Sequence, residues 1–100
     1  MVEFLYWEGC PSHPEALQLL HEVLAELGRD DDICMIEVLS DEDARRLAFP
    51  GSPTIRVDGR DVDAKGAASR PSLACRIYHL DDGRPSPVPS RRQLQEALSR

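Results

Sequence analysis

The chain has 100 residues, of which 41% are hydrophobic and 30% charged, and its net charge is −6. This composition is typical of one globular domain that needs no disulfide or metal to support its core. The acidic balance argues against a nucleic-acid partner, because binding phosphates requires many basic side chains. No apolar run approaches the ~20 residues of a membrane span, and the first residues lack a secretion-signal pattern, so we expect a cytoplasmic protein with no membrane partner.

The first half of the chain predicts alternating strands and helices. Residues 2–6 form a short apolar run typical of a buried strand, and leucines at helical spacing predict a helix over 14–27 that Gly28 ends. Residues 33–39 are nearly all apolar, which predicts a strand covered on both faces. Cys34, in the middle of that run, is then expected to be an inert core residue.

The middle of the chain predicts a short helix and then a hairpin. Ser40 is placed to cap the short helix, which Gly51-Ser52-Pro53 breaks. Two runs, 54–57 and 61–63, flank an Asp-Gly pair, the pattern of a β-hairpin.

The last third predicts less regular structure. Residues 64–73 are small, polar and interrupted by Gly and Pro, so we expect a loop there, followed by a short extra strand over 74–78. A turn-rich connector over 81–89 then leads to a terminal helix that Ser90 begins as part of a capping pair.

These elements give the order β-α-β-α-β-β-α, and hence an α/β domain with a four-stranded mixed sheet flanked by helices. A right-handed crossover makes the first two strands parallel, and the hairpin adds two antiparallel strands. We expect a single domain over 1–100, in which 65–89 is a loop and extra-strand insertion before the terminal helix.

Cys10 lies where the first strand turns into the first helix. The positive end of a helix dipole favours the thiolate, which is the form that acts as a nucleophile or binds soft metals. The alternative is a small buried turn residue. His13 could pair with the Cys10 thiolate or shuttle a proton, or it could be a solvated first-turn residue. Ser12 is expected to cap the helix rather than to take part in chemistry.

Two motifs resemble the thioredoxin and glutaredoxin family, including its small bacterial members. Tyr6-Trp7-Glu8-Gly9-Cys10 is similar to the aromatic-rich approach to the reactive cysteine, and Ser52-Pro53-Thr54 is similar to the cis-proline motif before the third strand. The resemblance implies a thioredoxin-like fold, a cis Ser52–Pro53 bond, and a substrate-binding surface made by Trp7, Pro11, Ser52, Pro53 and Thr54. His13 replaces the family's second cysteine, so Cys10-Pro11-Ser12-His13 cannot close its own disulfide.

Cys75 is the candidate for a second reactive sulfur. The loop after the fourth strand could bring it to Cys10, or it could be an ordinary residue on one face of a strand. We expect thiol–disulfide exchange with a low-molecular-weight or protein partner, in which Cys10 attacks, His13 assists and Cys75 or an external thiol resolves. The alternatives are a soft-metal module for Hg²⁺ or Cu⁺ and a non-catalytic interaction domain. No ligand spacing for zinc is present, and no cofactor or resident metal is expected.

Overall fold

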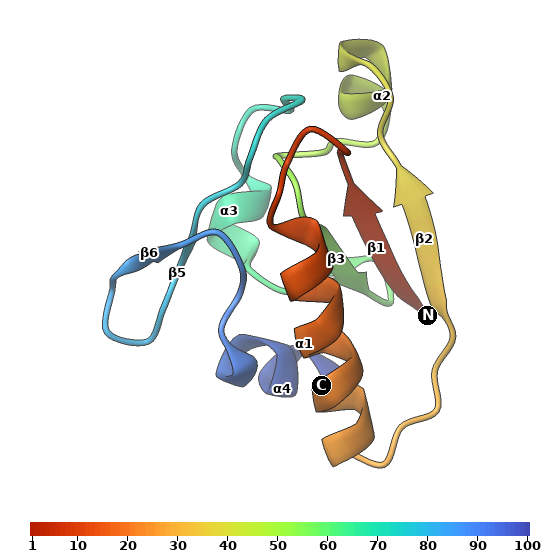
Figure 1. The fold of residues 1–100 in the computed structure, drawn as a ribbon, viewed down its shortest axis with the longest axis vertical. Coiled ribbons are helices and arrows are strands. Elements are labelled where there is room, and N and C mark those ends of the chain that lie inside the picture. Colours follow the sequence, from red (N-terminus) through yellow and green to blue (C-terminus); the bar gives the residue numbers. More distant parts are fainter.

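Four strands form one mixed sheet in the order β2-β1-β3-β4 (Figure 1). The structure is a computed structural model that describes residues 1–100. The strands are β1 (Val2–Tyr6), β2 (Ile33–Glu37), β3 (Thr54–Val57) and β4 (Arg60–Asp61). β1 is parallel to β2 and antiparallel to β3, which is antiparallel to β4. The predicted α/β class, the mixed sheet, the parallel first pair and the hairpin are therefore confirmed.

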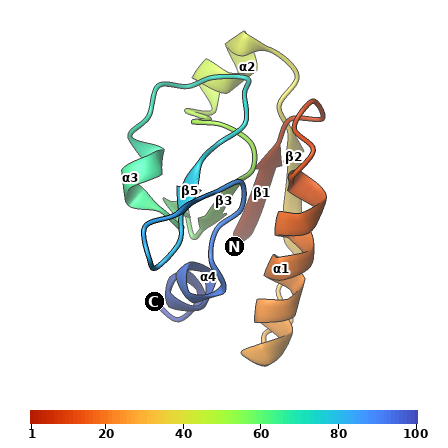
Figure 2. The same ribbon diagram turned by 60° about the vertical axis from the view of Figure 1, so that its left-hand side comes forward.

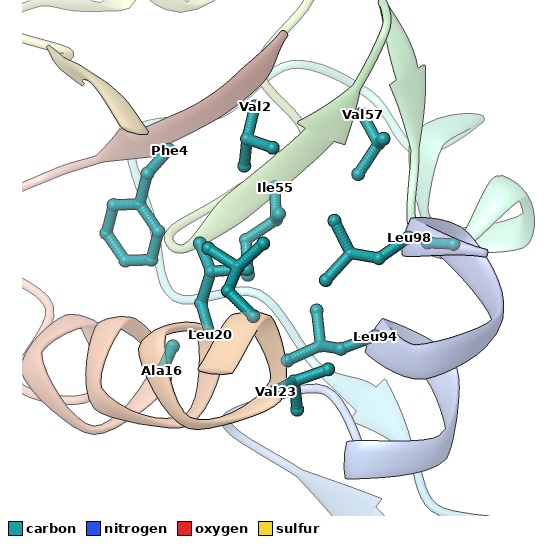
Figure 3. Packing of buried hydrophobic residues seen from close by; sticks show 11 residues of the cluster. Val2, Phe4, Ala16, Leu20, Val23, Ile55, Val57, Leu94 and Leu98 are labelled. Atoms are coloured by element: carbon teal, nitrogen blue, oxygen red, sulfur yellow. The ribbon is translucent and has the colours of Figure 1, made fainter. Parts of the chain in front are cut away.

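Two of the four helices cover the same face of this sheet. The helices are α1 (His13–Glu26), α2 (Asp41–Arg46), α3 (Ala64–Ala67) and α4 (Arg91–Leu98). Alternate residues of a strand point to one face, and here Val2 and Phe4 of β1 lie opposite Val57 and Ile55 of β3. Side chains of α1 and α4 pack on these four to make the main core (Figure 3): Ala16, Leu20, Val23, Leu24, Leu94, Ala97 and Leu98.

The other face of the sheet has a much smaller cover. Leu5 packs there with Val38, Ala44 and Phe49, at the end of the sheet where α2 lies (Figure 2). Cys34 is paired in register with Glu3, which lies on the same face of the sheet as Leu5. Its side chain is therefore on this second, largely uncovered face, which we call the open face. It is exposed, so the prediction of an inert core cysteine in a strand covered on both faces is wrong. β2 is an edge strand, and an apolar run does not by itself show how many neighbours a strand has.

The segment after β4 is more ordered than expected. Asp63 leaves the strand and its carboxylate accepts hydrogen bonds from the amides of Lys65 and Gly66, which begins α3 where a loop was predicted. β4 consequently ends at Asp61 rather than Asp63. A separate two-stranded sheet follows, made by β5 (Tyr78–His79) and β6 (Pro85–Ser86).

A serine was predicted to cap the start of three helices, and two of these caps are confirmed. Ser40 accepts a hydrogen bond from the Asp43 amide, and Ser90 forms a full capping box with Gln93. Ser12 precedes α1 but its side chain makes no capping hydrogen bond, so that prediction is wrong.

None of the four helices is both long and apolar enough to cross a membrane.

Candidate thiol site

Cys10 lies in the tight turn that joins β1 to α1. Its amide donates a hydrogen bond of 3.0 Å to the carbonyl of Trp7, which closes the turn. The indole of Trp7 folds over Gly9, where a Cβ would lie only 2.3 Å from the ring, so the turn requires glycine at this position. The Cys10 side chain points inward and is 0% exposed. The candidate nucleophile is therefore buried at the end of the sheet.

Hydroxyl and carbonyl oxygens surround the Cys10 sulfur. Its Sγ is 3.0 Å from the hydroxyl of Ser12 and 3.4 Å from the carbonyl oxygen of Ser52, to which the thiol can donate. This explains the missing helix cap: Ser12 has helical backbone angles, and its hydroxyl turns toward the sulfur instead of toward the first amides of α1. Ser12 belongs to the thiol site.

A segment from the far end of the sequence pairs with Ser52. The Ser52 amide donates to the carbonyl of Ala74 at 2.8 Å, and the Arg76 amide donates to the Ser52 carbonyl at 2.9 Å. Together these bonds form an isolated parallel bridge between Ser52 and Cys75. Figure 2 shows how the chain after α3 rises to the α2 end of the sheet before it returns to β5. The same Ser52 carbonyl accepts from both Arg76 and Cys10, so this segment is fixed next to the buried thiol.

The two sulfurs perturb each other in opposite directions. Burial alone would raise the pKa of Cys10, but hydrogen bonds from the side chain and backbone of Ser12, and then interactions with the Cys75 and Ser52 side chains, lower it below its ordinary value. The pKa of Cys75 is raised by its interaction with Cys10, by burial and by repulsion from the Cys10 thiolate. Cys10 is thus the first of the pair to lose its proton, although Cys75 is the one exposed to solvent.

Arg76 fixes the segment that carries Cys75. Its guanidinium forms a bidentate ion pair with Asp61, with N···O distances of 2.8 and 2.9 Å, and both side chains are almost completely buried. It also donates to Thr54 Oγ1 at 3.2 Å and to the carbonyl of Asp63 at 3.0 Å, which leaves only Nε without a partner. Such planar two-point pairing holds a side chain in one orientation. Arg76 therefore connects the Cys75 segment rigidly to β3 and β4.

Tyr78 adds a second attachment. Its ring is buried beneath the Arg76 guanidinium, 4.4 Å from the ring centre, and its hydroxyl donates to the carbonyl of Pro53 at 2.6 Å. Burial raises the pKa of Tyr78, so the hydroxyl keeps its proton and remains a donor. Gly51 permits the close approach, because a Cβ there would lie 3.0 Å from the Arg76 backbone and its φ is +139°.

His13 does not join the sulfurs. Its ring packs against Tyr6 with centres 4.9 Å apart, and its Nε2 is 3.8 Å from a carboxylate oxygen of Glu8. It makes no hydrogen bond to Cys10 and is absent from the groups that shift the pKa of that thiol. Residues three apart at a helix start can meet, but here the ring lies against an aromatic and an acidic neighbour instead of the sulfur.

The residues expected to bind substrate divide into two groups. Ser52, Pro53 and Thr54 are buried, and the chain's own 74–78 segment already uses their backbone or side-chain groups. Trp7 is half-buried over Gly9, while Pro11 is exposed. The Ser52–Pro53 bond is cis, as predicted.

Sequence reasoning missed the residues that position Cys75, namely Arg76, Asp61 and Tyr78. The alternation of residues 75–78 separates Cys75 and Ile77 from Arg76 and Tyr78, but only the structure shows that the face with Arg76 and Tyr78 is the buried one. An arginine on the inward face of such a run indicates a buried acidic partner. The sequence could not show that Asp61 is that partner.

The chain contains no group of three or more His, Cys, Asp or Glu side chains that could hold a metal ion. Comparisons with protein-family models, curated proteins and solved structures found no match. What can be inferred about function therefore comes from the geometry of this site.

Proposed function

We propose that this chain is a thioredoxin-like thiol protein that cycles between a Cys10/Cys75 dithiol and an internal disulfide. The observation that carries the proposal is that Ser52 joins the two cysteines: it forms a bridge with Cys75, and its carbonyl oxygen lies 3.4 Å from the Cys10 sulfur. The lowered pKa of Cys10 and the raised pKa of Cys75 agree with this placement. The strand order and the position of Cys10 after β1 support the thioredoxin-like part of the proposal, since the family resemblance implies both. The second cysteine comes from position 75 instead of the position that His13 occupies.

The reaction balances as a two-electron exchange. The dithiol gives two electrons and two protons to an external disulfide, which leaves as two thiols, while a bond forms between the Cys10 and Cys75 sulfurs. The first step forms a mixed disulfide and releases one thiol; the second cysteine then attacks, forms the internal bond and releases the other thiol. The fixed 74–76 segment supports the second step, because it holds the Cys75 sulfur near Cys10 whichever of the two forms the mixed disulfide.

Controlled oxidation tests this function. The reduced protein is equilibrated with glutathione buffers of increasing oxidised fraction, quenched by alkylation and mapped by mass spectrometry. We expect Cys10 and Cys75 to become protected together, at a defined glutathione ratio, while Cys34 stays available to the alkylating agent or to glutathione. Cys34→Ser should behave like the parent chain. A protein in which Cys10 and Cys75 never become linked would overturn the proposal.

The same pair favours one alternative, capture of a soft metal ion such as Hg²⁺ or Cu⁺ by two thiolates. The exchange proposal and this alternative differ in what removal of one sulfur does. Cys75→Ser should abolish internal disulfide formation in the first case, and in the second it should weaken Cu⁺ binding measured by competition with a chromogenic chelator. A chain that binds Cu⁺ through both sulfurs and does not exchange with glutathione would be a metal-binding module.

A further inference from the structure

The exposed sulfur and the reactive sulfur are different atoms in this site. Cys10 has the lowered pKa but is 0% exposed, and its sulfur lies 3.4 Å from the carbonyl oxygen of Ser52, the residue that bridges to the 74–76 segment. Cys75 is exposed on the outer side of that segment. An exchange step requires the external disulfide to come within bonding distance of one of the two sulfurs. Of the two, only Cys75 is exposed to solvent.

The segment is not free to move aside easily. Arg76 is held by four hydrogen bonds, three of them to the side chains of Asp61 and Thr54, and Tyr78 is held by the carbonyl of Pro53. Moving this segment would require breaking these buried contacts, which is costly for an ion pair whose partners are both shielded from water. Access to the pair is therefore from the Cys75 side.

An apolar depression lies beside the exposed sulfur. It has a volume of about 270 Å³ and is lined by Cys75, Arg76, Ile77, Pro85, Ser86 and Pro87. The side chain of Ile77 is 63% exposed there, although it is a large apolar residue. The one charged residue of the lining, Arg76, already has its guanidinium paired with Asp61. The volume suits a ring-sized group of a small molecule, since it lies just below the range of about 300–1,000 Å³ for pockets that hold a whole ligand.

We infer that Cys75, not Cys10, forms the mixed disulfide with the external partner, and that the partner is a low-molecular-weight disulfide whose apolar group lies against Ile77, Pro85 and Pro87. This inference rests on the proposed function and reverses the roles that the sequence predicts for the two cysteines. Cys75 is the substrate-facing sulfur, and Cys10 is the internal partner that completes the exchange.

The chemistry is consistent with this assignment in both directions. Toward oxidation, the exposed Cys75 thiol gives its proton to water as its sulfur attacks the external disulfide and expels one thiolate, which takes up a proton. Cys10, whose lowered pKa favours the thiolate, then attacks Cys75 Sγ, which forms the internal bond and expels the second thiolate. Toward reduction, an external thiolate attacks the exposed Cys75 sulfur and Cys10 departs, and a thiol of lowered pKa is the better leaving group.

Two single-thiol variants test the assignment in the Cys34→Ser background. Cys10→Ser leaves Cys75 as the only thiol, and Cys75→Ser leaves Cys10. Each folded variant is mixed with uncharged 4,4′-dithiodipyridine, and thiopyridone release is followed together with the intact mass. We expect the Cys75-only variant to react at least about tenfold faster, because the Cys10 sulfur is shielded from solvent. Equal rates, or a faster Cys10-only variant, would overturn the inference.

The parent chain gives an independent measurement, because Cys75→Ser could loosen the cover over Cys10. Limiting iodoacetamide followed by peptide mapping should label Cys75 before Cys10 in the reduced protein. Labelling of Cys10 first would contradict the inference while leaving the internal disulfide, and thus the proposed function, intact. If no internal disulfide forms at all, the proposed function fails instead, whichever thiol is labelled first.

The depression is tested through Ile77, which is exposed and can be changed without disturbing the core. In the Cys75-only chain, Ile77→Ser should slow the reaction with 4,4′-dithiodipyridine about threefold relative to that with oxidised glutathione, since apolar contact is lost only for the aromatic disulfide. Leu39→Ser, at an equally exposed residue 70% open to solvent, is the matched control. An unchanged ratio for Ile77→Ser would exclude the depression from substrate binding.

Discussion

Cys34 and Cys75 are both exposed thiols, yet their surroundings differ in every other respect. Cys34 lies on an edge strand, on the open face of the sheet, and makes no side-chain hydrogen bond. Cys75 lies on a segment fixed by buried contacts, it is bridged to Ser52, and its pKa is raised first by Cys10. Exposure gives a thiol access to solvent, but only a neighbouring sulfur allows a mixed disulfide to be resolved within the chain. Substitutions in the two surroundings test what maintains that difference.

The largest effect on stability is expected when the segment that carries Cys75 is released. Arg76→Ala leaves Asp61 buried without its partner, which should lower the free energy of unfolding by about 3–5 kcal/mol in urea titrations. The freed segment should also let the pKa of Cys75 fall toward the ordinary range, so that Cys75 titrates as an isolated exposed thiol does.

Arg84→Ala is the matched control for that experiment. Both side chains of its ion pair with Asp82 are exposed, so the free energy of unfolding should fall by only about 0–1 kcal/mol. Should Arg76→Ala fail to fold, Arg76→Lys keeps the charge but loses the two-point pairing, and it should still destabilise the chain more than Arg84→Ala does. Equal losses for the two positions would mean that the buried ion pair does not hold the segment.

Ser12 tests the thiol site more directly, because its position predicts a helix cap but its hydroxyl contacts the Cys10 sulfur instead. Ser12→Ala should raise the pKa of Cys10, measured from thiolate absorbance near 240 nm, with little loss of stability since no cap is removed. Ser90→Ala should do the opposite: it removes a real capping box at a cost of about 1 kcal/mol and leaves the thiol titration unchanged. A stability loss without a pKa change in Ser12→Ala would restore Ser12 to the role of a cap.

These serines show how far sequence patterns reach. All three precede helices and have a suitable partner three residues later, and local chemistry correctly predicts the caps at Ser40 and Ser90. At Ser12 the hydroxyl contacts the sulfur of Cys10, two residues earlier, instead of the first amides of α1, because Cys10 is turned inward at this point. Periodicity and turn residues likewise predict the four strands of the mixed sheet and the two larger helices, because those signals are local. They do not predict β6, which lies in the expected connector, and they place the extra strand at 74–78 where β5 is Tyr78–His79.

The site is less predictable because its second half comes from a distant segment. The position of Cys10 follows from a strand-to-helix turn, but the position of Cys75 depends on Arg76 reaching Asp61, fifteen residues away. No local pattern encodes which buried carboxylate an arginine will find. The same limit explains Cys34, whose exposure depends on β2 being at the sheet edge.

The pH dependence of stability tests the opposite pKa shifts of the pair. Below the ordinary thiol pKa of about 8.5, the native chain binds fewer protons than the unfolded chain because Cys10 is already ionised, so the free energy of unfolding should rise with pH. Above it, native Cys75 keeps a proton that the unfolded chain has lost, so stability should fall again.

Cys10→Ser removes both effects, since the shift of Cys75 arises first from Cys10. The difference in unfolding free energy between the parent and Cys10→Ser, measured under reducing conditions from pH 6 to pH 10, should therefore peak near the ordinary thiol pKa. A flat difference would show that the two sulfurs titrate independently, and the contrast with Cys34 would disappear.

The smallest effect is expected at Cys34 itself, and it is what makes the other results interpretable. Cys34→Ser replaces an exposed thiol on the open face of an edge strand, so the free energy of unfolding should change by no more than about 0.5 kcal/mol. The glutathione ratio at which Cys10 and Cys75 become linked should not move either, because neither pKa shift has Cys34 among its causes. If Cys34→Ser did shift that ratio, part of the exchange would proceed by an intermolecular disulfide of Cys34 at the sheet edge, and not by the Cys10–Cys75 pair alone.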